Sequence, residues 1–148
     1  MSNAPRTTVV FETGNGKFQN KVEIGAHTFF ASEPAELGGD DSGPTPIEIM
    51  NAALGACTSI TLRMYADRKG WPLRSIYVEI SHQRGKAEEC AIEGREVPSH
   101  PQEIFTKKIK LEGPLDPKQI ERLLMIADKC PVHRILTQQA CLRTQLIS

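Results

Sequence analysis

Several features that mark particular protein classes are missing from this sequence. Charge of one sign is not in excess, because eighteen Lys and Arg residues balance eighteen Asp and Glu residues. This balance removes the electrostatic argument for binding nucleic acid or an anionic membrane. No apolar run is long enough to cross a membrane, since Thr58 and Ser59 interrupt the most apolar stretch. The first ten residues, MSNAPRTTVV, lack a charged start followed by an apolar run, so we expect no signal peptide.

Internal repeats and low-complexity segments are also missing. A chain of 148 residues has the size of a single domain with a hydrophobic core of its own. We therefore expect one domain over residues 1–148, with an N-terminal meander (6–31), a central helix (45–68) and a second half (73–148). Four cysteines without a secretion signal favour cytoplasmic thiols over a structural disulfide framework.

The stretch from Pro44 to Trp71 predicts one long helix. Thr45 fits the N-cap, Pro46 fits the first helical position, and Glu48 completes a capping box. The run that follows is apolar on nearly every side, so we expect this helix to lie inside the protein. Only three short apolar strands precede it, and this limited cover predicts a dimer.

Alternation and turn residues predict the remaining elements of an α+β fold. Three short strands form an antiparallel meander, and further strands follow the central helix. In one of these, Lys107 interrupts an otherwise apolar face. A second helix has Asp116 as its cap and ends before Pro131. The predicted strands span residues 7–12, 18–24, 27–31, 75–82, 104–111 and 139–147.

Cys130 has the strongest local argument for a reactive thiol. Pro131 can open a new short helix with Cys130 at its cap, where free N–H groups and the helix dipole favour a thiolate. His133 and Arg134 follow closely and add positive charge. A buried cysteine at a helix junction is the alternative, and the residues leave both open. Cys-x-x-His is only half of a zinc signature, so we expect no metal site and no cofactor.

Cys57 has a weaker local argument. It lies more than two turns inside the central helix, too far for the dipole to act, and an apolar wall would raise its pKa. Taken alone it fits a small core residue better than a nucleophile. Cys90 lies among acids that disfavour a thiolate, and Cys141 fits a packing residue in the last strand.

Two cysteine motifs in order carry a resemblance to a known family. The segment GPTPIEIMNAALGACTSITLRMYADRKGW, followed about seventy residues later by IADKCPVHRIL, resembles the OsmC/Ohr superfamily, and within it the OsmC-like branch of predicted redox proteins. The resemblance implies an OsmC-like α+β fold, in which antiparallel sheets wrap around two long central helices in an intertwined homodimer.

The resemblance also implies a thiol peroxidase that reduces organic hydroperoxides in oxidative stress defence. Cys57 would attack the peroxide and become a sulfenic acid, and Cys130 would resolve it as a disulfide. An external dithiol would then reduce the disulfide. This order reverses the ranking of the two cysteines from local physics alone.

Two positions depart from the peroxidase branches of the family, which activate the first cysteine with a hairpin arginine and a glutamate near the helix start. Lys17 stands at or beside the arginine position and supplies charge without the bidentate fork. Ile47 occupies the place of the carboxylate, with Glu48 next to it. Arg63 is not expected to substitute for the arginine.

Two other functions stay open at this point. A long buried helix wrapped by an antiparallel sheet also describes hot-dog thioesterases, in which a helix N-terminus polarises a thioester carbonyl. A non-catalytic dimer that binds a small apolar ligand between its subunits would also use the apolar helix.

Overall fold

The computed structural model describes residues 6–90 and 96–147. The chain forms two compact units, residues 1–50 and 51–148. Within the described ranges, no helix is both long and apolar enough to cross a membrane.

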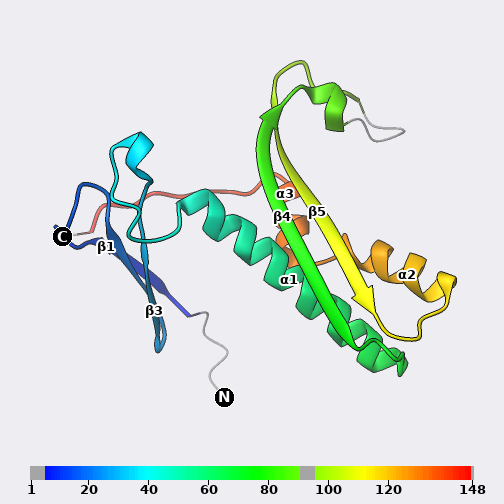
Figure 1. Cartoon of the computed structure of the whole chain (residues 1–148). Coiled ribbons are helices and arrows are strands. Elements are labelled where there is room, and N and C mark those ends of the chain that lie inside the picture. Colours follow the sequence, from blue (N-terminus) through cyan, green and yellow to red (C-terminus); the bar gives the residue numbers. More distant parts are fainter. Residues whose placement is uncertain (1–5, 91–95, 148) are drawn as a thin grey trace. The chain divides into compact units, whose positions relative to one another are not determined.

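The first unit contains the predicted antiparallel meander (Figure 1). Strands β1 (Thr8–Glu12), β2 (Asn20–Ile24) and β3 (His27–Ala31) lie in that order. In the register Val10 faces Val22, and Val22 faces Phe29. Gly25 takes a φ of 58° in the tight turn between β2 and β3, a value that glycine adopts without the steric cost that other residues bear. The meander is confirmed.

A short loop with a 3₁₀ turn, η1 (Ala35–Leu37), leads from the meander to the long helix α1 (Pro46–Lys69). The predicted capping box starts this helix. The Thr45 backbone N–H donates to Glu48 Oε2 at 2.7 Å, and the Glu48 backbone N–H donates to Thr45 Oγ1 at 3.2 Å. Each bond satisfies an N–H that has no partner within the helix.

The second unit is built on a long antiparallel ribbon of β4 (Ser75–Gly85) and β5 (Gln102–Glu112). Along both strands partly buried side chains alternate with exposed ones, as predicted. The 3₁₀ turn η2 (Ala87–Cys90) follows β4. Residues 91–95, which follow this turn, lie outside the described ranges.

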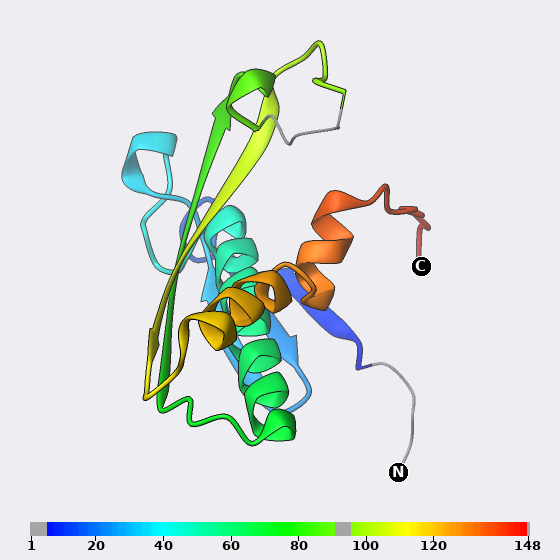
Figure 2. The same ribbon diagram turned by 90° about the vertical axis from the view of Figure 1, so that its right-hand side faces the viewer.

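Two further helices complete the second unit. Helix α2 (Pro117–Ala127) begins with the predicted capping box of Asp116 and Gln119, and α3 (Pro131–Thr137) begins at the predicted cap Cys130. Figures 1 and 2 show α1 and α2 beside the β4–β5 ribbon. The core between them comprises Leu62, Tyr65, Ala66, Leu73, Leu123, Ile126 and Ala127.

The expected burial of α1 is only partly met within the second unit. Its buried residues form one stripe, while Ile60 and Met64 are 59% and 67% exposed. The physical reason is that the other elements of the second unit pack against only one side of this helix.

The predicted last strand, residues 139–147, is also wrong. This segment has no regular structure and pairs with no strand among the described residues. Leu142 and Leu146 are 93% and 100% exposed. A strand needs a neighbouring edge for its N–H and C=O groups, and the alternation of residue types in the sequence does not supply one. Cys141 is exposed with the rest of this segment, so it is not the packing residue that was expected.

Candidate active site

The second unit brings two cysteines together from distant parts of the chain. Cys57 lies in α1, and Cys130 is the N-cap residue of α3. The extended backbone at Cys130 (φ −64°, ψ 145°) and Pro131 at the first helical position form the helix start that the sequence predicted. The Cys130 Sγ accepts a hydrogen bond from the His133 backbone N–H at 3.3 Å, so the thiol itself serves as the cap.

Cys130 is fully buried and touches one hydroxyl group of α1. Its Sγ lies 3.6 Å from Thr58 Oγ1, and Thr58 is also fully buried. The Thr58 hydroxyl donates its single proton to the carbonyl oxygen of Leu54 at 2.8 Å. Since that proton is committed, the Cys130 S–H is the donor in its contact with Thr58. The thiol therefore both accepts a hydrogen bond and donates one.

Cys57 is half-buried and has three neighbours that act on its thiol. Burial raises the pKa of this thiol, and the adjacent Cys130 thiol raises it further. The Val132 backbone N–H and the Thr61 hydroxyl act in the opposite direction, but the net pKa is above the ordinary value of 9.0. Within this chain Cys57 is therefore predominantly a neutral thiol at neutral pH. All four cysteines of the chain are free thiols in this structure.

A lysine on the inner face of β5 connects to the segment around Cys130. Lys107 Nζ donates to the Ala127 carbonyl oxygen at 2.8 Å and to His133 Nδ1 at 3.0 Å, and it lies 3.0 Å from Asp128 Oδ1. The ammonium group has no acceptor site, so His133 Nδ1 must accept and the neutral ring carries its proton on Nε2. Burial lowers the pKa of His133, the Lys107 charge lowers it further, and Asp128 partly opposes both.

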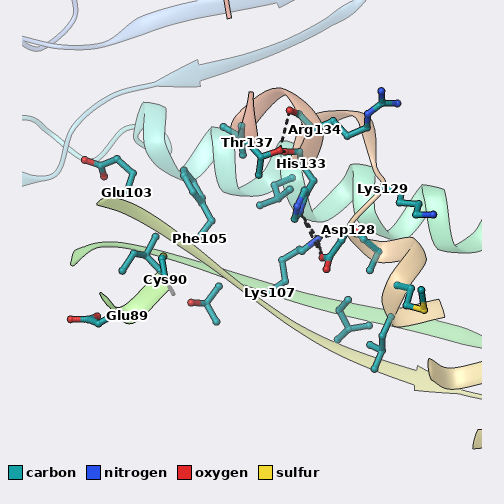
Figure 3. A pocket seen from close by; sticks show the side chains of 18 residues that line it. Glu89, Cys90, Glu103, Phe105, Lys107, Asp128, Lys129, His133, Arg134 and Thr137 are labelled. Carbon is teal, nitrogen blue, oxygen red and sulfur yellow. Dashed lines mark hydrogen bonds and ion pairs between the residues drawn. The ribbon is translucent and has the colours of Figure 1, made fainter. Parts of the chain in front are cut away.

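This network lies in the wall of a cavity of about 980 Å³ in the second unit. In Figure 3, Lys107 and His133 point toward one another on one side of the cavity, with Glu89 and Cys90 on another. The lining combines charged side chains with apolar ones such as Phe105 and Leu136. Its size suits a small organic molecule. Cys57 and Cys130 are not among the lining residues.

Arg134 lines the same cavity, and its side chain forms no ion pair within the described ranges. Arg63 donates to the carbonyl oxygen of Leu73 at 2.6 Å, as part of the connection between α1 and β4. Its other guanidinium nitrogen donates to the carbonyl oxygen of Arg74 at 3.2 Å.

The remaining predicted site residues, Lys17 and Glu48, belong to the first unit. The Lys17 ammonium lies 5.1 Å from the centre of the Phe18 ring, and the Glu48 carboxylate is held in the helix cap. The structure therefore gives each of them a local partner within its own unit.

Sequence reasoning did not identify Lys107 and Thr58 as site residues. The signal for Lys107 was visible, because a lysine on the apolar side of an alternating strand needs an internal partner. Thr58 gave no comparable signal, since a buried threonine next to an apolar helix segment is common. In the ranges 6–90 and 96–147, no group of three or more His, Cys, Asp or Glu side chains is placed to hold a metal ion.

Solved structures with the same fold support the architecture. An organic hydroperoxide resistance protein OsmC from Legionella pneumophila, also described as a predicted redox protein, is 18% identical with a TM-score of 0.66, covering 93% of this chain and 92% of that chain. An OsmC like protein from Mycoplasma pneumoniae is 12% identical with a TM-score of 0.69, covering 91% and 89%. The organic hydroperoxide resistance protein OhrB of Bacillus subtilis is 17% identical with a TM-score of 0.59, covering 90% of each chain.

At these low identities, the structural similarity establishes a shared fold of the α+β class with antiparallel sheets. No curated protein sequence matches the chain significantly. The family model described as OsmC-like protein matches residues 39–144, which include α1, the β4–β5 ribbon and the cap at Cys130. The chain therefore belongs to the OsmC-like protein family.

Proposed function

We propose that this protein is a cysteine-based thiol peroxidase that reduces organic hydroperoxides. The observation that carries the proposal is that the Cys130 thiol lies next to Cys57 and acts on its pKa, although the two residues are more than seventy positions apart in the sequence. Family membership and neighbours named organic hydroperoxide resistance proteins support a redox role in peroxide detoxification.

In the proposed reaction, the Cys57 thiolate attacks the terminal oxygen of the hydroperoxide. The O–O bond breaks, the alkoxide takes up the proton that the Cys57 thiol lost and leaves as the alcohol, and Cys57 becomes a sulfenic acid. The Cys130 sulfur then attacks the sulfenic sulfur, the S–O bond breaks, and the hydroxide leaves as water with the proton of the Cys130 thiol. An external dithiol reduces the resulting disulfide by thiol–disulfide exchange. No cofactor or metal takes part in these steps.

The raised pKa of Cys57 means that the reaction needs a further positive charge near this thiol. We propose that a homodimer supplies it, with Lys17 of the N-terminal hairpin as the cation and Glu48 as its supporting carboxylate. His133 and Arg134 add positive or hydrogen-bonding groups next to Cys130. The exposed apolar side chains on α1, such as Ile60 and Met64, support a second copy as the missing cover.

We place the reaction in the cytoplasm, where cellular reductants keep thiols reduced between turnovers. Light scattering after size exclusion tests the homodimer, and a stable monomer would contradict it. In a dimer, Lys17→Met is expected to slow the reaction of Cys57 with peroxide, and Lys17→Arg is expected to preserve it.

Thiol titration with peptide mapping tests the proposed chemistry. One equivalent of cumene hydroperoxide is expected to remove two thiols per chain and to produce a Cys57–Cys130 disulfide. Cys57→Ser is expected to abolish peroxide consumption, and Cys130→Ser is expected to leave a Cys57 sulfenic acid that dimedone traps. Cys90→Ser and Cys141→Ser serve as matched controls, because both thiols are exposed and outside the pair. Full peroxide turnover by Cys57→Ser would reject the proposal.

A non-catalytic binder of a small apolar ligand is the second candidate function, favoured by the cavity of about 980 Å³. Melting-temperature shifts with apolar ligands, together with four thiols that stay unreactive toward peroxide, would support it. The thioesterase alternative has less support, because the family model and the neighbours named organic hydroperoxide resistance proteins favour a redox role.

A further inference from the structure

Lys107 occupies an unusual position for a lysine. It lies on the face of β5 that carries Phe105, Ile109 and Leu111, and its side chain is only 11% exposed. An ammonium group loses much of its hydration at such a position, so it is tolerated only with good internal partners. The neighbouring Lys108, on the opposite face, is 71% exposed and has a single weak ion pair with Glu79 at 3.5 Å.

The partners of Lys107 lie on both sides of Cys130 in the sequence. Ala127 and Asp128 precede the cysteine, and His133 follows it. Two hydrogen bonds and one ion pair therefore give the ammonium ion three partners. A single side chain from β5 therefore joins the end of α2 to the first turn of α3, and Figure 3 shows Lys107 beside Asp128 and His133. Cys130 lies between these attachment points in the sequence.

The same first turn of α3 holds the Cys130 sulfur, because the His133 backbone N–H donates to Sγ. Lys107 thus acts on the residue that caps the thiol, and it does so through the His133 ring. Lys107 is not itself a neighbour of either sulfur in the contacts described above. Its effect on the thiol pair would be exerted through the junction between α2 and α3.

We infer that Lys107 is a positioning residue that holds the α2–α3 junction so that the Cys130 sulfur stays within reach of Cys57. The inference rests on the proposed peroxidase function, because it assigns Lys107 to the step in which Cys130 resolves the Cys57 sulfenic acid. That step gains its rate from two sulfur atoms held in place, and a misplacement of about 1 Å can cost roughly 100-fold in rate.

The first experiment separates resolution from the initial oxidation. In Lys107→Met, formation of the Cys57–Cys130 disulfide is expected to slow by at least ~10-fold relative to the initial oxidation of Cys57 by cumene hydroperoxide. Dimedone trapping is expected to capture more Cys57 sulfenic acid than in the wild type. Lys107→Arg keeps the charge and several donors, so it is expected to restore much of the disulfide rate. Lys108→Met is the matched control and is expected to behave as the wild type.

A second measurement does not require peroxide chemistry. In a Cys57→Ser background, Lys107→Met is expected to raise the rate at which iodoacetamide alkylates Cys130 by at least ~10-fold, because the junction opens more often. The nitrogen chemical shifts of the His133 ring are expected to show loss of the Nδ1 acceptor state. If Lys107→Met does not fold, Lys107→Gln is used for both measurements, because it retains a donor for the Ala127 carbonyl oxygen.

The outcomes distinguish this inference from the proposed function. Disulfide formation and Cys130 alkylation at wild-type rates in Lys107→Met would overturn the inference and leave the peroxidase proposal intact. A wild-type protein whose Cys57 does not react with hydroperoxide would overturn the peroxidase proposal. In that case, faster alkylation of Cys130 would still support the positioning role, and an unchanged alkylation rate would overturn it.

Discussion

Replacing the buried Thr58 hydroxyl separates the hydrogen-bonding part of the Cys130 environment from its packing. Thr58 is fully buried, donates to the Leu54 carbonyl oxygen at 2.8 Å, and lies 3.6 Å from Cys130 Sγ. Thr58→Val keeps the shape of the side chain and removes its oxygen. The Leu54 carbonyl oxygen still accepts the helical N–H bond four residues on, whereas the Cys130 S–H loses its acceptor.

The expected cost of Thr58→Val is about 1 kcal/mol in the free energy of unfolding, the usual net value of one intramolecular hydrogen bond. For a chain of this size, that cost lowers the melting temperature by about 2–4 °C. Thr58→Ser is the matched control. It keeps the hydroxyl and loses one buried methyl group, which also costs about 1 kcal/mol. The two variants are therefore expected to have similar stability.

The two variants differ in what they do to the thiol. The S–H stretching band of Cys130, measured by infrared spectroscopy with the other three cysteines replaced by serine, is expected to move to higher frequency in Thr58→Val. The band is expected to stay in place in Thr58→Ser. Equal bands in both variants, or a Thr58→Val protein more stable than the wild type, would refute the assignment of Cys130 as the donor to Thr58.

Two further predictions concern the surroundings of the thiol pair. The pKa of His133 is lowered from 6.5, so below about pH 6.5 the unfolded chain binds more protons than the folded one. The free energy of unfolding is therefore expected to fall as the pH drops from 6.5 toward the pKa of folded His133. Urea titrations at several pH values should show a smaller loss in His133→Phe. Leu123 is fully buried, whereas the adjacent Leu124 is 47% exposed. In urea unfolding, Leu123→Ala is therefore expected to lower the free energy of unfolding by about 2–5 kcal/mol, and Leu124→Ala by well under half as much. Equal losses in the two variants would contradict the packing of α2 described above.

The starts of α1, α2 and α3 were predictable from sequence because helix caps are local. Thr45 with Glu48, Asp116 with Gln119, and Cys130 before a proline each satisfy backbone N–H groups within three residues. The strands of the meander and of the β4–β5 ribbon were predictable for a similar reason, since alternation and turn glycines act over a few residues.

The tertiary structure alone decided which side chains meet. The family resemblance implied that Cys57 and Cys130 act together, but local sequence physics did not. Their proximity, the contact of Thr58 with the Cys130 thiol, and the attachment of Lys107 on both sides of Cys130 join segments 20 or more residues apart. Local sequence physics ranked Cys130 above Cys57 and left Lys107 as an interruption of a pattern, because neither spacing nor periodicity encodes these contacts. The last segment, residues 139–147, shows the same limit, since alternation favours a strand but only a paired edge makes one.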